Sequence, residues 1–465
     1  MDVAIVGAGT AGLAALREVR KETDDFVIVN KRPYGTTCAR VGCMPSKTLI
    51  AAANAFHART SMATFGIDGS DRLTVDIPAV LARVRRLRDD FVEGVLKATD
   101  ELGERDISGH ARLDGPNTLD IEDRKIEARQ IILAPGSSPI VPKAWQDLGD
   151  DILTTDTLFE QQDLPRRIGV IGLGAIGVEM AQALARLGLE VHGFDGGDKM
   201  AGIADAKIAE LLRDGLSREF AVHLGANVDL ARAGDGIEIT WDGGRVFVDK
   251  VLVAVGRRQN VADLGLETLG VPLDDNGLPD VDPQTMRIGD TPVLMAGDAN
   301  GANPILHEAS DEGHIAGLNA MSPDPERLER RIPMTITFCT PQVASVGQKA
   351  DEIDNCLTGE VDFATQGRAR VMQENFGLLR VYAARADGRI LGAELAAPAG
   401  EHLAHLLGLA IARDLTAHDV LRMPIYHPVL EEGLRTALRQ IAKALPPCSV
   451  SDLADCGPLH VEALE

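Results

Sequence analysis

Two glycine-rich turns, each between a short apolar strand and a helical stretch, constrain the fold of this chain more than any other feature. The first, Gly7-Ala8-Gly9-Thr10-Ala11-Gly12, follows an apolar strand at 2–6, and the second, Gly172-Leu173-Gly174-Ala175-Ile176-Gly177, follows one at 167–171. Apolar strands at 26–29 and 190–194 complete two βαβ units that begin about 165 residues apart. A single turn of this kind can be an ordinary strand–helix connection, but two strand-flanked copies predict two dinucleotide-binding folds.

The glycines of both turns are expected to bind pyrophosphate. A helix N-terminus carries unpaired N–H groups and a partial positive charge. Glycine lets a pyrophosphate approach that backbone closely. We therefore assign one dinucleotide to Gly7, Gly9 and Gly12, and a second to Gly172, Gly174 and Gly177.

The residue that ends the second strand of each unit is expected to bind the adenosine ribose. In the second unit this residue is Asp195. Its carboxylate can accept both ribose hydroxyls and repels a 2′-phosphate, which favours NAD over NADP; the alternative is a solvated loop acid beside Gly196-Gly197-Asp198. In the first unit the position is Asn30, whose amide holds a ribose hydroxyl less strongly than a carboxylate does.

The rest of the chain extends this α/β pattern. Residues 81–101 have helical periodicity, with Leu81, Val84, Leu87, Phe91 and Val95 on one face. Apolar strands at 131–133, 251–253 and 293–295 each end in a glycine-containing turn, and short strands fill 111–131. From residue 333 the pattern changes to antiparallel-looking strands and helices.

Charge and hydropathy exclude two classes of partner. The net charge of −23 repels nucleic acid phosphates. No apolar run is long enough to cross a bilayer. Met1 leads almost directly into a strand without a signal peptide, so we expect a cytoplasmic protein.

Cys38 and Cys43 are the closest pair among the six cysteines. Two thiols five positions apart at the start of a helix can form a disulfide if the first turn is distorted. Helix N–H groups and Lys47 would lower their pKa values. No further ligands lie at short spacing, so no metal site is predicted. The pattern alone leaves two readings open, a redox pair and two buried structural cysteines.

The segment from Gly35 to Lys47 resembles the active-site stretch of the FAD-dependent disulfide reductases, the family of dihydrolipoamide dehydrogenase and glutathione reductase. The resemblance covers nearly the whole chain, and the Cys-x4-Cys-x-Pro-Ser-Lys pattern is highly specific. Its companion motifs follow in order, at 134–136, 172–179, 256–258, 297–298 and 427–432. A member of this family binds FAD and a pyridine nucleotide.

The resemblance implies a role for each redox residue. Cys38 exchanges with the substrate disulfide, Cys43 faces the flavin, and Lys47 lies near flavin N5 and pairs with Glu179 beside the nicotinamide. Asp298 holds the ribityl chain, and Leu306 and His307 open a helix aimed at the flavin. The implied FAD residues are Gly7, Gly9, Gly12, Asn30, Lys47, Gly136, Asp298, Leu306 and His307. The implied NAD residues are Gly172, Gly174, Gly177, Glu179, Asp195 and Gly256.

His427 and Glu432 form the implied acid–base dyad. Thiol–disulfide exchange needs a proton moved between thiols, and an imidazole titrates in the right range. A carboxylate on the other ring nitrogen fixes the tautomer. In this family the dyad acts in the partner subunit's site, which predicts a homodimer.

The predicted fold class is therefore α/β, with two Rossmann-like domains and an α+β C-terminal domain. We expect an FAD domain at 1–145, an NAD domain at 146–264, a central segment completing the FAD site at 265–332, and an interface domain at 333–465. The leading function is dihydrolipoyl dehydrogenase, with a lipoyl-bearing carrier protein as a transient partner. The alternatives are an NAD(P)H-dependent reductase of another disulfide or of a metal ion, and a flavoprotein scaffold without redox activity.

Several positions depart from the family pattern. Thr36 replaces a usual glycine, Asn30 a usual acid, and Ala175 stands where some members have a nicotinamide-shielding tyrosine. Tyr426 replaces the alanine usual in lipoamide enzymes. Near the C-terminus, Cys448 and Cys456 form either a second thiol relay, a regulatory disulfide or two unrelated thiols.

Overall fold

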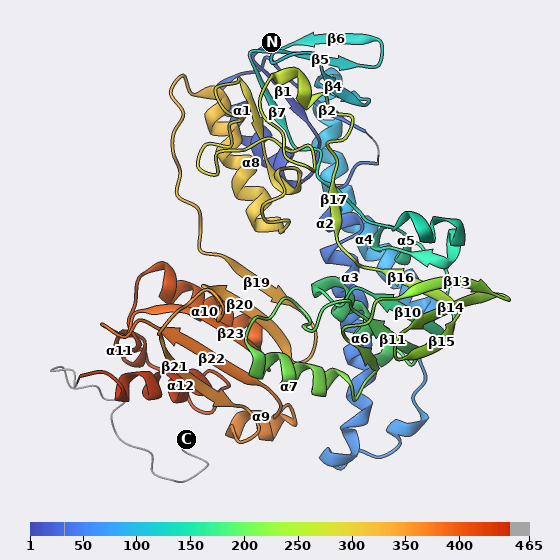
Figure 1. Cartoon of the computed structure of the whole chain (residues 1–465), viewed down its shortest axis with the longest axis vertical. Helices are drawn as coiled ribbons and strands as arrows, with labels where there is room; N and C mark the ends of the chain where they lie inside the picture. The colour runs from blue at the N-terminus through green and yellow to red at the C-terminus, as the bar shows by residue number, and fades with distance from the viewer. Residues whose placement is uncertain (32, 447–465) are drawn as a thin grey trace.

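The structure, a computed structural model, describes residues 1–31 and 33–446. The hypotheses on Cys448 and Cys456 concern positions outside this part of the chain. Figure 1 shows three bodies: a unit with the N-terminus at the top, a second α/β unit at the lower right, and an antiparallel domain at the lower left. Among the described residues, no helix is long and apolar enough to span a membrane.

The N-terminal unit is built on a parallel sheet in the order β18-β7-β1-β2-β3. Its strands are β1 (Val3–Val6), β2 (Phe26–Asn30), β3 (Asp106–Ser108), β7 (Gln130–Leu133) and β18 (Val293–Met295). The helices α1 (Thr10–Glu22) and α8 (Leu306–Met321) pack side by side on one face. The other face packs against a small antiparallel sheet of β4 (Ala111–Leu113), β5 (Thr118–Ile121) and β6 (Arg124–Glu127). Because both faces are covered, the central strands are almost entirely apolar.

Three helices connect this unit to the second one. They are α2 (Thr37–Arg40), α3 (Cys43–His57) and α4 (Ile77–Asp100), with short 3-10 turns between α3 and α4. The helix α4 begins four residues before the predicted Leu81, because the Asp76 side chain accepts a hydrogen bond from Ala79 N at 3.0 Å.

The apolar face predicted for α4 is buried at its start and exposed in its middle. Leu81 and Val84 are fully buried, but Phe91 is 42% exposed. Arg88 takes the buried position instead, and its guanidinium pairs with Asp89 and Glu160. The apolar pattern alone does not show that the Arg88 side chain lies largely buried while its two carboxylate partners remain exposed at the surface.

The second unit repeats the parallel architecture in the order β12-β11-β10-β16-β9. Its strands are β9 (Ile152–Leu153), β10 (Arg167–Ile171), β11 (Glu190–Phe194), β12 (Ala221–His223) and β16 (Lys250–Val253). Its helices are α5 (Thr155–Leu158), α6 (Ala175–Arg186) and α7 (Ala206–Leu216).

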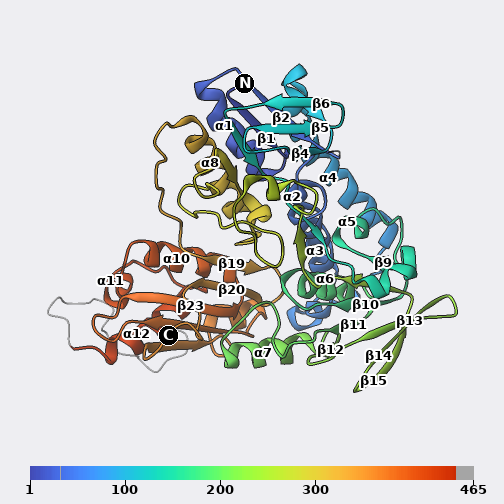
Figure 2. The ribbon, with the colours of Figure 1, turned by 45° about the horizontal axis from the view of Figure 1, so that its top comes forward.

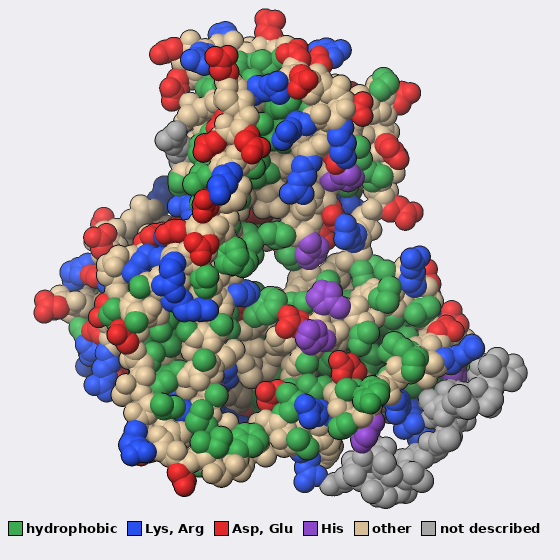
Figure 3. All heavy atoms as spheres, turned by 180° about the vertical axis from the view of Figure 1, so that it is seen from behind, with side chains coloured by type: hydrophobic (Ala, Val, Ile, Leu, Met, Phe, Trp, Pro, Cys, Tyr) green, Lys and Arg blue, Asp and Glu red, His purple; other side chains and the backbone are tan. Residues whose placement is uncertain are grey.

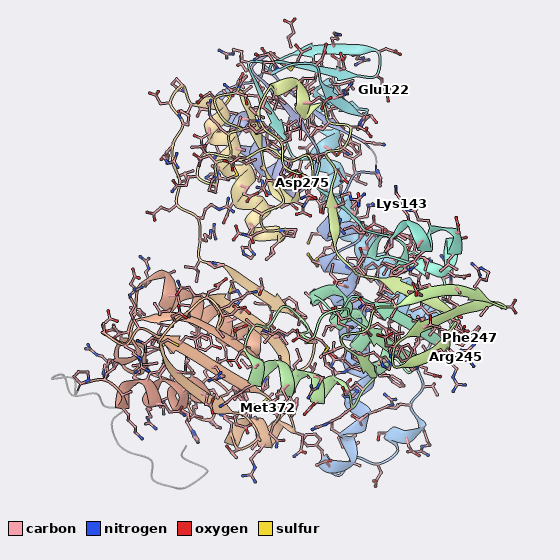
Figure 4. All side chains as sticks on the ribbon, viewed as in Figure 1. Glu122, Lys143, Arg245, Phe247, Asp275 and Met372 are labelled. Carbon is pink, nitrogen blue, oxygen red and sulfur yellow. The ribbon has the colours of Figure 1, made fainter. Side chains whose placement is uncertain are left out.

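A three-stranded antiparallel sheet covers one face of this unit. Its strands are β13 (Asp229–Ala233), β14 (Gly236–Trp241) and β15 (Gly244–Val248). Figure 4 shows Arg245 and Phe247 on β15, and the guanidinium of Arg167 lies 4.6 Å from the centroid of the Phe247 ring. A two-stranded ribbon of β8 (Ser137–Pro139) and β17 (Arg257–Gln259) links the two parallel units.

The C-terminal domain is an antiparallel sheet in the order β19-β20-β23-β22-β21 with helices against it (Figure 2). The strands are β19 (Met334–Thr337), β20 (Gln342–Gly347), β21 (Leu357–Asp362), β22 (Leu378–Ala383) and β23 (Ile390–Ala397). The helices are α9 (Gly367–Met372), α10 (Gly400–Ala412), α11 (Ala417–Leu421) and α12 (Glu432–Lys443).

A buried carboxylate ties this domain to the second α/β unit. Glu394 on β23 is fully buried and accepts hydrogen bonds from the backbone N–H groups of Ala204, Asp205 and Ala350, at 2.7, 3.1 and 3.1 Å. The three donors come from both sides of the boundary, so the carboxylate fixes the contact between the two bodies. Seen from behind, the molecule has an opening where its three bodies meet, bordered by hydrophobic and histidine side chains (Figure 3).

Candidate redox and dinucleotide sites

A cavity of about 800 Å³ lies at the carboxyl ends of the strands of the N-terminal sheet. Of the residues predicted to bind FAD, Gly7, Gly9, Asn30 and Gly136 line this cavity. Gly12, Lys47, Asp298, Leu306 and His307 are not part of that lining. Open parallel sheets bind dinucleotides at this edge.

The geometry of the first glycine turn leaves room for a pyrophosphate. Gly7 has a φ of +106°, and a Cβ there would lie 2.1 Å from the Ala134 carbonyl oxygen. A Cβ on Gly12 would lie 1.8 Å from the Gly7 oxygen, so Gly12 allows α1 to pack on the turn. At Gly9, by contrast, a Cβ would point into open space in front of the helix N-terminus. The three glycines thus have separate roles, and the turn fits a bound dinucleotide.

The second turn has the same arrangement. Cβ atoms on Gly172 and Gly177 would lie 2.4 Å from the Ala254 oxygen and 1.7 Å from the Gly172 oxygen. Gly174 again faces open space. This turn therefore also fits a dinucleotide. Gly256, which was predicted to contact NAD, lies at the turn after β16 and has a φ of +119°.

Asn30 and Asp195 occupy equivalent positions and make equivalent hydrogen bonds. Asn30 Oδ1 accepts from Ala8 N at 3.0 Å, and Asp195 Oδ2 accepts from Leu173 N at 2.6 Å. In both units the donor is the residue between the first two glycines. Asp195 Oδ1 also accepts from Gly197 N at 2.8 Å, which aims the carboxylate beside the turn.

Cys38 and Cys43 lie on consecutive helices, Cys38 within α2 and Cys43 as the first residue of α3. Both are free thiols, and the Cys38 thiol donates a hydrogen bond to Cys43. This hydrogen bond, helped by the Lys47 charge, lowers the pKa of Cys43 to about 7, against the opposing effects of burial and Glu179. The same contact and burial raise the pKa of Cys38. The opposite directions of the two pKa shifts favour Cys43 over Cys38 as the thiolate of the pair.

Thr36 shows how the chain accommodates its departure from glycine. Its φ is +50° with a ψ of 149°, a conformation that favours glycine. Its hydroxyl compensates in part by capping α2, because Thr36 Oγ1 accepts from Ala39 N at 3.2 Å.

Lys47 and Glu179 form an ion pair between α3 and α6. Lys47 Nζ lies 2.9 and 2.7 Å from the two carboxylate oxygens. Glu179 Oε1 also accepts from Phe338 N at 2.8 Å, and Lys47 Nζ lies 4.6 Å from the centroid of the Phe338 ring. The Glu179 side chain is only 6% exposed and that of Lys47 is 35% exposed. The ammonium group is thus fixed by a buried carboxylate and an aromatic ring.

Two buried polar residues on the same face of α6 were not identified from the sequence. Gln182 makes hydrogen bonds at 2.7 Å to both the N–H and the C=O of Thr340. Arg186 pairs with Glu219 and donates to Asn54 on α3 at 2.5 Å. The spacing of 179, 182 and 186 on a helix with an otherwise apolar buried face is the signal that could have revealed them.

Asp298 belongs to a hydrogen-bonded chain at the β8–β17 ribbon. Ser137 Oγ donates to Asp298 at 2.5 Å and accepts from Arg257 Nε at 2.8 Å. Nearby, α8 begins at Leu306, and the side chains of Leu306 and His307 are partly exposed at its first turn.

His427 and Glu432 are in contact in the C-terminal domain. His427 Nδ1 lies 3.0 and 3.2 Å from the two carboxylate oxygens of Glu432. The His427 side chain is 52% exposed and that of Glu432 only 7%. Tyr426, beside the dyad, is 83% exposed. The Glu432 carboxylate is thus buried, and the His427 ring nitrogen that does not contact it is on the exposed side of the imidazole. An acid–base group that acts on an external substrate needs such an accessible nitrogen.

Family models match most of the chain. The model described as pyridine nucleotide-disulphide oxidoreductase matches residues 1–313, and that of the dimerisation domain of the same family matches residues 333–438.

Similar proteins carry related names. A dihydrolipoyl dehydrogenase of Thermus scotoductus is 30% identical and one of Geobacillus stearothermophilus 29% identical, with 95% and 93% of this chain and 97% and 94% of those proteins covered. Among solved structures, LpdA from Mycobacterium tuberculosis matches with a TM-score of 0.83 at 24% identity, over 94% of this chain and 99% of that one. The HOCl-induced flavoprotein disulfide reductase RclA from Escherichia coli matches with a TM-score of 0.82 at 21% identity, over 94% and 99%. These structural matches show a common fold.

Proposed function

The chain belongs to the pyridine nucleotide-disulphide oxidoreductase family, and we propose that it oxidises dihydrolipoyl groups with NAD through FAD and the Cys38–Cys43 pair. The hydrogen-bonded thiol pair, with its lowered Cys43 pKa, is the observation that carries the redox assignment. The relatives named dihydrolipoyl dehydrogenase, similar over almost their whole length, support the substrate.

In the proposed reaction the chain's own residues perform the exchange. One sulfur of the substrate dithiol attacks Cys38 as the Cys38–Cys43 disulfide breaks, which leaves Cys43 as a thiolate. The second substrate sulfur then displaces Cys38, which leaves a substrate disulfide and a reduced pair. His427 accepts the substrate's thiol proton at its outward nitrogen, and Glu432 stabilises the resulting charge. Bound FAD would supply the two-electron relay from the pair to NAD.

The remaining residues bind and orient the cofactors. Gly9 and Gly174 allow the two pyrophosphates to approach the helix N-termini, because the space in front of both glycines is open. Lys47, held by Glu179 and Phe338, places a positive charge between the two α/β units. Asp195, with both oxygens anchored by backbone N–H groups, favours the free ribose of NAD over a 2′-phosphate.

The match to the dimerisation domain of the family supports a homodimer. We propose that His427 acts in the partner subunit's site, which agrees with its exposure on the single chain. A lipoyl-bearing carrier protein as partner, a cytoplasmic location and domain boundaries at 145, 264 and 332 are parts of the same proposal.

A reductase of another disulfide is the second candidate. Tyr426 favours it, because an 83% exposed aromatic side chain next to His427 adds bulk where a substrate would approach. A scaffold without redox activity is disfavoured by the completeness of the thiol pair, the Lys47–Glu179 pair and the His427–Glu432 dyad.

Steady-state turnover distinguishes these candidates. The purified holoenzyme is assayed with dihydrolipoamide, free lipoate and glutathione disulfide, each with NAD(H) and with NADP(H). The proposal predicts the highest kcat/KM for dihydrolipoamide with NAD. A higher value for glutathione disulfide, or no turnover of any disulfide, would refute it.

A further inference from the structure

The loop that carries His427 is held to the rest of the C-terminal domain through its backbone. It runs from the end of α11 at Leu421 to the start of α12 at Glu432. Arg435 donates to the Ile425 carbonyl at 3.2 Å, before the histidine. After the histidine, the contacts converge on Val429.

The peptide groups of Val429 are held from two directions. Val429 N donates to Glu432 Oε2 at 3.1 Å, and the Val429 carbonyl accepts from Gln366 Nε2 at 2.8 Å. Glu432 uses the same carboxylate to bind His427. A shift of Val429 would therefore change the position of Glu432 relative to the imidazole.

Gln366 is built to hold this carbonyl in one orientation. It lies 63 residues away in the sequence, just before α9, and is 8% exposed. Its Oε1 accepts from Ala369 N at 2.7 Å and caps α9, the helix that ends at Met372 in Figure 4. Because Oε1 is bonded to an N–H donor, the amide cannot rotate by half a turn without losing both bonds. Its N–H donor is thus directed at Val429.

We propose that Gln366 is a positioning residue for the His427–Glu432 dyad, acting through the Val429 peptide. This inference rests on the proposed function of His427 as the acid–base group. Leu430, which is 7% exposed, anchors the same stretch in the core, while Tyr426 and His427 project outward. The base of the loop is fixed and its tip is free to meet a substrate, so the Gln366 contact sets where the imidazole stands.

The test variant is Gln366→Glu. Glutamate keeps the chain length and the oxygen that caps α9, but it removes the N–H donor and places a carboxylate oxygen against the Val429 carbonyl. The matched control is Gln440→Glu on α12. Gln440 Nε2 donates to the Glu360 carbonyl at 2.7 Å and its Oε1 accepts from Glu360 N at 3.0 Å, the same kind of backbone clamp in the same domain but away from the His427 loop.

With dihydrolipoamide and NAD, Gln366→Glu should lower kcat roughly tenfold, because loss of the tether displaces the dyad. The KM for NAD should stay at the wild-type value. NADH-dependent reduction of ferricyanide, which needs the flavin but no acid–base dyad, should also be unchanged. Gln440→Glu should behave as wild type in all three measurements.

The double variant Gln366→Glu, His427→Gln separates positioning from a general structural effect. If Gln366 acts through His427, the double variant should be no slower than His427→Gln alone. A further roughly tenfold loss would overturn the inference, and so would wild-type kcat in Gln366→Glu. Should Gln366→Glu fold poorly, the apolar, length-matched Gln366→Met takes its place in the same cycle. Wild-type turnover of His427→Gln would instead refute the proposed function itself.

Discussion

The hydrogen bond between the two thiols makes a quantitative prediction about Cys43. Cys38→Ala removes the donor, whereas Cys38→Ser keeps a hydroxyl donor in its place. A hydrogen bond to a charged group contributes about 1.5–3 kcal/mol, and one pKa unit corresponds to about 1.4 kcal/mol. The alanine variant should therefore have a Cys43 pKa about one to two units higher than the serine variant, whose value should stay near the native value of about 7.

The assay is a pH titration of both variants with FAD bound. A Cys43 thiolate beside oxidised flavin should give a long-wavelength charge-transfer band, present above the Cys43 pKa and lost as the pH falls through it. The serine variant should lose the band near pH 7 and the alanine variant at a higher pH. Equal midpoints would show that the Cys38 contact does not set the pKa. A band that persists in Cys43→Ser would refute the assignment of Cys43 as the flavin-facing thiol.

Three further predictions test other parts of the site. Asp195→Ala should weaken NAD binding by roughly tenfold or more, since a carboxylate–ribose contact contributes about 1–3 kcal/mol; equal use of NADP by the wild type would contradict this. Thr36→Gly should be about 1 kcal/mol more stable to urea than Thr36→Ala, because both lose the cap and only glycine relieves the positive φ; equal stability would show that the backbone is unstrained. Mixing His427→Gln subunits with Cys38→Ser subunits should restore activity, because the heterodimer has one intact site; no recovery after verified subunit exchange would place the site within one chain.

The sequence was sufficient to predict the parallel units because their signals are local. Strands at 167–171 and 190–194 were predicted with the bounds that the structure has. Their apolar runs and glycine turns are adjacent in the chain, so no tertiary information was needed. The burial of Arg88 in α4 could not be read from the periodicity, because its partner Glu160 is distant in sequence.

The same distinction applies to the candidate site. Cys38, Cys43, His427 and Glu432 were predicted because they form short motifs. Gln182 and Gln366 were missed, since each makes its contacts with backbone groups of a segment far along the chain. The position of a glutamine in the sequence carries no periodicity or spacing that indicates a distant backbone partner. Only the folded structure shows which backbone group the glutamine contacts.

The two dinucleotide turns together explain why Asn30 can replace an acid. In both units, the residue at the end of the second strand accepts the N–H between the first two glycines. An amide oxygen can take the place of the carboxylate there, with a longer contact of 3.0 Å for Asn30 against 2.6 Å for Asp195. The structural part of the role is therefore preserved in the first unit. The other polar atom of the side chain differs between the two residues. Asp195 has a second, negatively charged oxygen that accepts a hydrogen bond from Gly197 N, whereas Asn30 has an amide nitrogen that donates to the Lys31 carbonyl at 3.3 Å. Discrimination against a 2′-phosphate depends on that negative charge. Under the proposed assignment, the charge is kept in the unit expected to distinguish NAD from NADP, and the unit expected to bind FAD does not require it.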